Sequence, residues 1–261
     1  MNNLSTPQVP PWNFGMPLAG QTLDWLPTDT EYYFNQAMQN PEHQAYFEAL
    51  GWHLPGAITY KINSHGFRCD EIVDGEPCVV ALGCSYTAGT GLPIEVIWPT
   101  LVGQALNMRV VNLAWGGLSA DSCFRLAEYW IPKLRPRLVT MLTPPVARLE
   151  LCLDEQAVKG VRNVPVDVYM PGSDDIKDNW FLKNWFSNEE NHRINNVKNK
   201  LAIRQLCQDL DIPYTILDVA TYMYDSREKL GYARDLLHAG IPAHKKIAET
   251  IINDWSKTQH A

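Results

Sequence analysis

Short apolar runs alternate with longer stretches of helical periodicity through most of this chain, and this alternation restricts the fold more than any other feature. Each run is short enough and apolar enough for a strand buried on both faces. The predicted strands lie at 77–82, 109–114, 137–143 and 213–219. Strands that alternate with helices form a mainly parallel sheet with helices on both faces. The sequence therefore predicts an α/β fold, a three-layer sandwich with a mainly parallel sheet.

Further elements are expected around this framework. Segments 95–107 and 119–133 are the predicted crossover helices, and one helix is expected around residues 30–50. A last helix is predicted to begin near Pro242, because proline suits the first helical turn, where no amide hydrogen is required. An apolar run at 57–62 is expected to form an edge strand.

The pattern Ser187-Asn188-Glu189-Glu190 predicts the start of another helix, because S-x-x-E is a capping box. Apolar residues in this predicted helix recur on one face, as in an amphipathic helix. They are Ile194, Val197 and Leu201.

The chain is expected to form one α/β domain with two additions. Residues 1–56 are rich in proline and tryptophan and are interpreted as an irregular arm packed on the domain, since its tryptophans need burial. Residues 57–261 form the predicted domain, with an insertion at about 150–187 that breaks the strand–helix alternation. The aromatic residues of the insertion are Trp180, Phe181 and Trp185.

Charge and composition exclude several classes of function. The net charge of −7 argues against a nucleic-acid partner, which requires a basic surface. No apolar run is long enough for a membrane span, and no basic segment followed by an apolar one indicates a secretory signal. The scattered cysteines are expected to be free, buried thiols in the cytoplasm, and no metal or cofactor is predicted. The cysteines are Cys69, Cys78, Cys84, Cys123, Cys152 and Cys207.

The first candidate for chemistry is Ser85, which follows the predicted strand 77–82. Gly83 permits a tight turn there, so the Ser85 hydroxyl is exposed at the carboxyl end of the strand, where ligands bind in such sheets. A serine in this place can act as a nucleophile and supply its own amide to an oxyanion. The glycines after Gly83 match neither a P-loop nor a dinucleotide fingerprint, which leaves nucleotide binding as a weaker alternative.

The second candidate is an Asp-x-x-His pattern, Asp235 to His238, which precedes the last predicted helix. A carboxylate three residues before an imidazole can accept its Nδ1 proton and leave Nε2 free to act on a serine.

Together the two patterns resemble those of the SGNH (GDSL-like) hydrolases. That family has a Gly-Asp-Ser turn after the first strand and an Asp-x-x-His near the C-terminus. Here Gly83-Cys84-Ser85 matches except that Cys84 replaces Asp, and Asp235 to His238 matches fully. The resemblance implies a flavodoxin-like SGNH hydrolase fold in which these three residues form a Ser-His-Asp catalytic triad. We expect Cys84 to point away from the site, because successive side chains of a strand face opposite sides.

The middle blocks of the family are matched less evenly. Asn112-Leu113 followed by Gly117 fits the second block, with Gly116 as a near alternative. The resemblance implies an oxyanion hole built from the amides of Ser85 and Gly117. The third block normally ends in Asn-Asp, but here the place is taken by residues 143–150, so Thr143 or the more distant Arg148 is expected to substitute for the asparagine.

Two further expectations concern how the serine turn is held. The segment 63–71 resembles one found upstream of the serine in some members, and Arg68 in it is expected to pair with a carboxylate. The family's Asp forms structural hydrogen bonds that Cys84 cannot replace, so the hydroxyls of Thr87 or Thr90 are expected to hold the turn.

The resemblance implies a serine-dependent hydrolase of small-molecule or carbohydrate esters, within a family that includes esterases, acyl hydrolases, carbohydrate deacetylases and transacylases. The alternative is a non-catalytic binding or structural protein on the same scaffold, since fold alone does not fix function. The sequence selects neither a natural substrate nor an oligomeric state.

Overall fold

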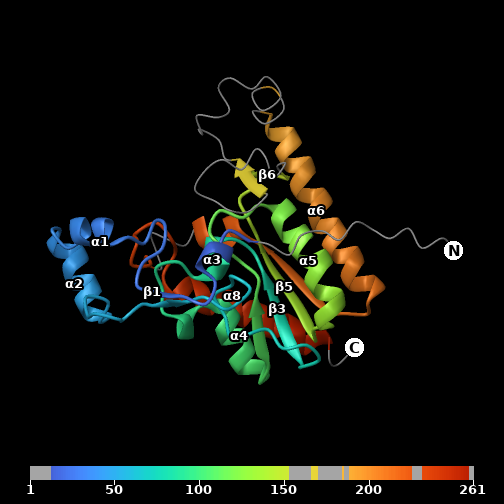
Figure 1. Ribbon diagram of the computed structural model, residues 1–261, viewed down its shortest axis with the longest axis horizontal. Coiled ribbons are helices and arrows are strands. Elements are labelled where there is room, and N and C mark those ends of the chain that lie inside the picture. Colours follow the sequence, from blue (N-terminus) through green and yellow to red (C-terminus); the bar gives the residue numbers. More distant parts are fainter. Residues whose placement is uncertain (1–12, 153–165, 170–183, 185–187, 225–230, 259–261) are drawn as a thin grey trace.

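A parallel sheet forms the centre of the molecule in the computed structural model, which describes residues 13–152, 166–169, 184, 188–224 and 231–258 (Figure 1). Its strands have the order β4-β3-β5-β8, and every neighbouring pair is parallel. They are β3 (Cys78–Leu82), β4 (Arg109–Asn112), β5 (Leu138–Thr143) and β8 (Tyr214–Asp218). The strands predicted from the four apolar runs are confirmed.

The strand order has a direct consequence for function. The first strand of the sheet, β3, lies between the second and the third, which is the flavodoxin-like order. In such a sheet the crevice outside the carboxyl ends of the two central strands is the usual place for a ligand. Ser85 follows β3 directly and therefore lies at this crevice.

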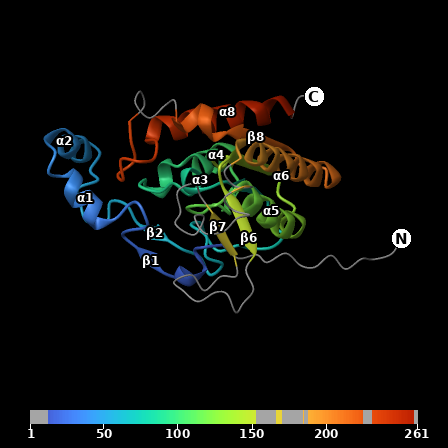
Figure 2. The ribbon, with the colours of Figure 1, turned by 90° about the horizontal axis from the view of Figure 1, so that it is seen from above.

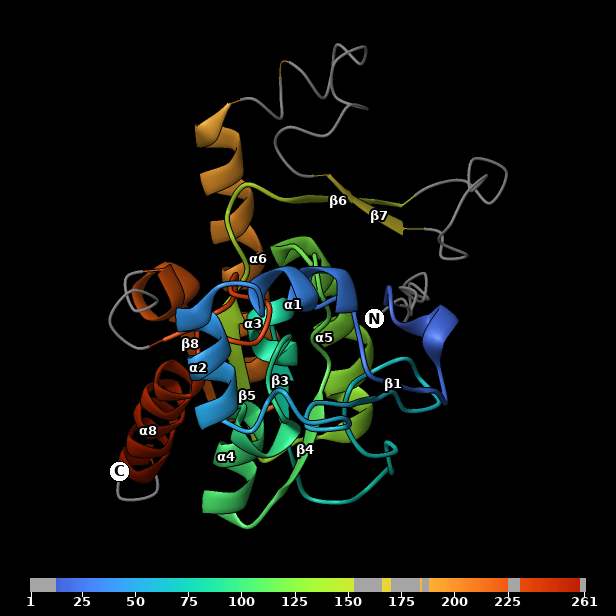
Figure 3. The ribbon, with the colours of Figure 1, turned by 90° about the vertical axis from the view of Figure 1, so that its left-hand side faces the viewer.

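Helices cover both faces of the sheet, so the predicted three-layer α/β fold is confirmed (Figure 3). One face carries α4 (Trp98–Leu106) and α8 (Ile241–Thr258), which pack against each other. The other carries α5 (Ala120–Leu134) and α6 (Glu189–Asp209), which also pack together. The crossover helices predicted at 95–107 and 119–133 correspond to α4 and α5.

The two helix pairs are held by different kinds of contact. Between α4 and α8 the buried side chains are mostly apolar, including those of Trp98, Val102 and Ile247. Between α5 and α6, Asp121 accepts hydrogen bonds from the Nδ2 groups of Asn195 and Asn199 at 2.9–3.0 Å. Buried polar groups need such partners, so this polar contact specifies how the two helices align.

The structure corrects two expectations about α6. Its N-cap is Asn188, whose side chain accepts from the amide of Glu190, one position after the predicted Ser187, which lies outside the described residues. The stripe predicted from Ile194, Val197 and Leu201 is exposed, because the face with Asn195 and Asn199 turns inwards to meet Asp121.

The segment before the central sheet is more ordered than the sequence suggested. It contains η1 (Met16–Leu18), β1 (Thr22–Leu23), α1 (Glu31–Ala37), α2 (Pro41–Ala49) and β2 (Tyr60–Lys61). The single helix expected around 30–50 is wrong, since Asn40 caps a new helix at Pro41. The run at 57–62 does not edge the central sheet, because β2 pairs with β1 in a separate antiparallel sheet.

Residues 13–56, the described part of the predicted arm and called the arm below, contribute to the core while α1 and α2 project to one side of the molecule (Figure 2). Leu26, Phe47 and Trp52 are buried members of the main hydrophobic cluster. Near its start the backbone approaches so closely that a Cβ on Gly15 would lie 2.1 Å from the carbonyl oxygen of Gly66.

Short elements complete the described chain. They are α3 (Ser85–Ala88), η2 (Ile94–Val96), β6 (Leu149–Cys152), β7 (Val166–Tyr169) and η5 (Ala220–Tyr224). The hairpin of β6 and β7 falls within the predicted insertion, whereas its Trp180, Phe181 and Trp185 lie outside the described residues. The five cysteines for which the structure describes a side chain are free and buried, as predicted.

Candidate active site

Ser85 is presented by a turn that depends on glycine. After β3 ends at Leu82, Gly83 takes φ = +155°, and a Cβ there would lie 2.1 Å from Oγ1 of Thr87. Real Cβ atoms do not approach another atom so closely, so this turn requires glycine. The chain then enters α3 with Ser85 as its first residue. An amide at the start of a helix has no intrahelical acceptor, so that of Ser85 is available to a ligand.

The turn is held by side chains from neighbouring elements. Asn112, at the end of β4, donates from Nδ2 to the carbonyl oxygen of Thr87 at 3.0 Å. The hydroxyl of Thr87, which was expected to hold the turn, is buried and has no hydrogen-bond partner within the described part of the chain. No hydrogen bond from the Thr90 hydroxyl is found among these residues either, so that expectation stays unsupported.

Arg68 also holds the nucleophile turn, although by contacts that the sequence did not predict. Its guanidinium is buried and donates to the carbonyl oxygens of Ala88, Gly89 and Leu92 at 2.6–3.1 Å. Among the described residues it pairs with no carboxylate, so the expected ion pair is wrong. Burial lowers the pKa of Arg68 to about 10, which still leaves it charged at neutral pH.

Asp235 and His238 lie on a compact loop between residues 231 and 240. The loop is closed by a bridge between Tyr232 and Ala239. Within it, Oδ1 of Asp235 accepts from the amides of Leu237 and His238, both at 3.0 Å. These two bonds fix the carboxylate and turn its other oxygen towards the imidazole.

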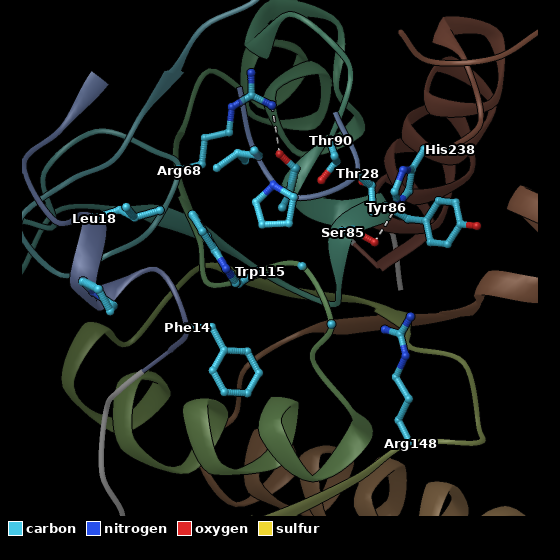
Figure 4. A pocket seen from close by; sticks show the side chains of 16 residues that line it. Phe14, Leu18, Thr28, Arg68, Ser85, Tyr86, Thr90, Trp115, Arg148 and His238 are labelled. Atoms are coloured by element: carbon cyan, nitrogen blue, oxygen red, sulfur yellow. Dashed lines mark hydrogen bonds between the residues drawn. The ribbon is translucent and has the colours of Figure 1, made fainter. Parts of the chain in front are cut away.

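The three predicted residues are brought together. His238 Nδ1 lies 2.5 Å from Asp235 Oδ2, and His238 Nε2 lies 2.7 Å from Ser85 Oγ (Figure 4). All three residues are buried, with exposed fractions of 7–8%. The ring of Tyr86 packs edge-on against the imidazole, with 4.6 Å between ring centroids. The expected contacts within the Asp-His-Ser set are therefore present.

Asp235 remains ionised in this setting. Burial alone would raise its pKa, but the hydrogen bond and charge of His238, together with the amides of His238 and Leu237, outweigh burial and hold the pKa below its ordinary value. A carboxylate that stays charged can orient an imidazole and stabilise its protonated form.

Ser85 and His238 open onto a cavity of about 610 Å³ whose wall is largely apolar (Figure 4). This volume lies within the usual range for small-molecule sites. The arm contributes six of the lining residues: Phe14, Pro17, Leu18, Leu26, Pro27 and Thr28. The main domain contributes Arg68, Ser85, Tyr86, Ala88, Thr90, Trp115, Gly116, Gly117, Arg148 and His238. Cys84 is buried and does not line the cavity.

The candidate oxyanion groups divide into two sets. Gly117, with φ = +85°, lines the cavity, and no atom lies within 4 Å of where its Cβ would be. Thr143 does not line the cavity, and its Oγ1 accepts from the amide of Val219 at 3.5 Å. Arg148 does line it, donates to the carbonyl oxygen of Leu118 at 3.0 Å, and points its guanidinium into the cavity in Figure 4.

The sequence analysis missed residues of the arm that reach this site. Thr28 donates from Oγ1 to Asp235 Oδ2 at 3.0 Å, although 207 positions separate the two residues. No local pattern marks Thr28, so only the folded structure identifies it.

Among the described residues, no three His, Cys, Asp or Glu side chains are arranged to hold a metal ion. None of the described helices is long and apolar enough to cross a membrane.

No family model and no curated protein matches this chain. Solved structures do show a similar fold. AlinE4, an SGNH-hydrolase family esterase, is 14% identical over 56% of this chain and 60% of its own length, with a TM-score of 0.33. TesA is 12% identical over 67% of this chain and 96% of its own, with a TM-score of 0.41.

The psychrotrophic esterase EstA from Pseudoalteromonas sp. is 12% identical over 71% of this chain and all of its own, with a TM-score of 0.37. Of AlinE4, in contrast, the matched part of this chain spans only 60% of the length. AlinE4 and EstA are esterases, and AlinE4 belongs to the SGNH-hydrolase family; the likeness of this chain to all three structures is distant.

Proposed function

We propose that this chain is a serine hydrolase that cleaves esters of apolar acyl groups. The observation that carries the proposal is the unbroken series of contacts from Asp235 through His238 to Ser85, ending at the wall of an apolar cavity. A nucleophile within hydrogen-bond reach of a base, which is itself oriented by a third group, is the arrangement that covalent catalysis requires.

Each side chain has one role in the proposed reaction. Ser85 Oγ attacks the ester carbonyl while His238 Nε2 takes the hydroxyl proton. His238 then gives that proton to the departing alcohol, which leaves an acyl group on Ser85. Water attacks the acyl-enzyme with His238 again as base, and the acid departs as Ser85 recovers its proton. Asp235 orients the imidazole and stabilises its charged form throughout.

The negative charge that develops on the carbonyl oxygen needs donors near Ser85. The amides of Ser85 and Gly117 supply them in this proposal. Arg148 replaces the asparagine of the related hydrolases as the third donor, since it lines the cavity whereas Thr143 bonds to Val219. A guanidinium always carries its charge, so it can stabilise an oxyanion from a position where a neutral amide would need closer contact.

The lining of the cavity supports an apolar acyl group as the substrate. Phe14, Leu18, Leu26 and Trp115 offer apolar surface, whereas a sugar requires several hydrogen-bonding partners. Hydrolysis of p-nitrophenyl octanoate should therefore exceed hydrolysis of the acetate. Faster cleavage of the acetate would instead favour a deacetylase.

The test of the nucleophile is labelling with a fluorophosphonate probe, followed by peptide mapping. We expect the label on Ser85, and a loss of roughly 10³-fold or more in kcat for Ser85→Ala. Cys84→Ala is the matched control, because it removes the neighbouring side chain and should keep activity. A label elsewhere, or full activity in Ser85→Ala, would contradict the mechanism. A folded protein that neither labels nor turns over ester would favour the non-catalytic alternative.

A further inference from the structure

Two consecutive residues of the arm contact two consecutive residues of the loop that carries the acid–base pair. Thr28 donates to Asp235 Oδ2, and Asp29 binds Arg234 through both carboxylate oxygens, at 2.9 Å from Nε and 2.7 Å from Nη2. Arg234 and Asp29 are buried, with exposed fractions of 4% and 1%. Bidentate Arg–carboxylate pairs fix orientation as well as distance. The arm thus clamps the Asp235 loop at two adjacent points.

The same clamp reaches the loop that follows the nucleophile turn. Tyr60 donates its hydroxyl proton to Asp29 and accepts from the amide of Gly91 at 2.8 Å. The carbonyl oxygen of Gly91 in turn accepts from the amide of Arg234 at 2.8 Å. Asp29 therefore links the loop of His238 to the loop that follows the nucleophile turn.

Thr28 has a backbone that is unusual for its residue type. Its φ is +77°, a region that β-branched residues rarely adopt because of steric clash. Strain of this kind persists only where the surroundings impose it, and it concentrates at functional sites. Here the imposed conformation brings Oγ1 to the oxygen of Asp235 that also contacts His238.

We propose that Thr28 is a positioning residue for the acid–base pair, held by the arm so that its hydroxyl orients Asp235 against His238. In Figure 4 Thr28, Ser85 and His238 gather at one side of the cavity. The inference rests on the proposed hydrolase activity. It assigns to the arm a part in catalysis beyond supplying a wall of the cavity.

The variant that tests this proposal is Thr28→Val, which keeps the shape of the side chain and removes the hydroxyl. We expect kcat of Thr28→Val to fall roughly 10- to 100-fold with KM little changed, because this loss corresponds to the strength of a hydrogen bond to a charged group. Thr28→Ser should restore kcat.

Three further measurements separate positioning from folding and from loss of the proposed function. Thr28→Gly relieves the backbone strain, so its stability should match or exceed that of the wild type while kcat falls. Thr22→Val, the same substitution on an exposed part of the arm, should leave activity unchanged. The downfield proton resonance of His238 Nδ1–H should shift in Thr28→Val and not in Thr22→Val.

The outcomes are distinguishable. Unchanged kcat in Thr28→Val, or a change in KM alone, would overturn the positioning role. An unshifted resonance in Thr28→Val would overturn it even if the wild type proves to have no esterase activity, because the resonance reports the Asp235–His238 contact without turnover. Absence of turnover and of labelling in the wild type would overturn the proposed function alone.

Discussion

The two halves of the candidate site are held in different ways. The turn of Ser85 follows a fully buried strand and depends on the conformation of Gly83 and on donors to its backbone from Asn112 and Arg68. The loop of Asp235 and His238 belongs to no strand of the central sheet and is tied by the side chain of Asp29 to residues at the other end of the chain.

The two halves are therefore sensitive to different kinds of substitution. Substitutions in the nucleophile turn should act through steric clash, since any added atom meets close-packed neighbours. Substitutions in the acid–base loop should act through electrostatics, since removing one partner of an ion pair leaves a buried charge without compensation. Substitutions in the two halves should therefore differ in size and in their response to pH.

The largest effect on stability is expected from Asp29→Asn. The variant leaves the buried guanidinium of Arg234 without its carboxylate, and breaking a buried pair costs about 3–5 kcal/mol. The free energy of unfolding, measured by urea denaturation, checks this. Glu76→Gln is the matched control, because its pair with Arg109 is exposed and should contribute at most about 1 kcal/mol. Equal losses of unfolding free energy in the two variants would show that the buried pair of Asp29 and Arg234 contributes no more than an exposed pair.

The next largest effect is expected from His244, which should make the stability of the protein depend on pH. This residue connects the start of α8, just after the acid–base loop, to α4. His244 is buried in the first turn of α8, and its Nδ1 accepts from the amide of Trp98 at 3.0 Å. Burial, with the nearby charges of His238 and Arg68, lowers the pKa of His244 from 6.5 to about 3.

Between these two values the unfolded chain binds a proton that the folded chain does not, so the free energy of unfolding falls as the pH falls. The expected loss is roughly 3 kcal/mol by about pH 4. His244→Gln keeps an acceptor and lacks the titration, so urea unfolding should vary less with pH in this variant than in the wild type. An identical pH dependence in both proteins would locate the acid sensitivity elsewhere.

The parts of the molecule that could be predicted from the sequence are those held by contacts between residues close along the chain. The strands and Ser85 depend on neighbours along the chain, and the Asp-x-x-His pattern closes on itself through the amides of Leu237 and His238. The clamp could not be predicted, because Asp29 and Arg234 are 205 positions apart and no local pattern couples them.

The helix α6 shows a different reason for failure. Its apolar stripe predicted the wrong inner face, because buried asparagines satisfied by Asp121 are indistinguishable in sequence from exposed ones. The candidate for a third oxyanion donor could only be narrowed to Thr143 or Arg148, since the choice depends on which side chain reaches the cavity.

A smaller effect on stability is expected from Gly83→Ala in the nucleophile turn. The new Cβ would lie 2.1 Å from Thr87 Oγ1 and 2.9 Å from the carbonyl oxygen of Leu142. Overpacking of this kind costs about 1–3 kcal/mol of the free energy of unfolding. It should also displace Ser85, so kcat should fall even where the protein remains folded. Kinetics and urea unfolding on the same preparation check this. Wild-type kcat in a stably folded Gly83→Ala protein would show that the turn tolerates a side chain.

The smallest effect is expected from Thr87→Val, two residues after Ser85. The sequence suggested that the Thr87 hydroxyl holds the turn, but this buried oxygen has no hydrogen-bond partner among the described residues. A buried hydroxyl without a partner retains its desolvation penalty, so replacing it with a methyl group of similar shape should be neutral or should stabilise the protein by up to about 1 kcal/mol. Asn112, which donates to the carbonyl oxygen of Thr87, would still hold the backbone, so kcat should be unchanged.

Asn112→Leu serves as the contrast to Thr87→Val, because it removes that donor and leaves the carbonyl oxygen of Thr87 buried without it. Urea unfolding of both variants decides the matter: a destabilised Thr87→Val with a stable Asn112→Leu would mean that the hydroxyl, and not the asparagine, secures the nucleophile turn.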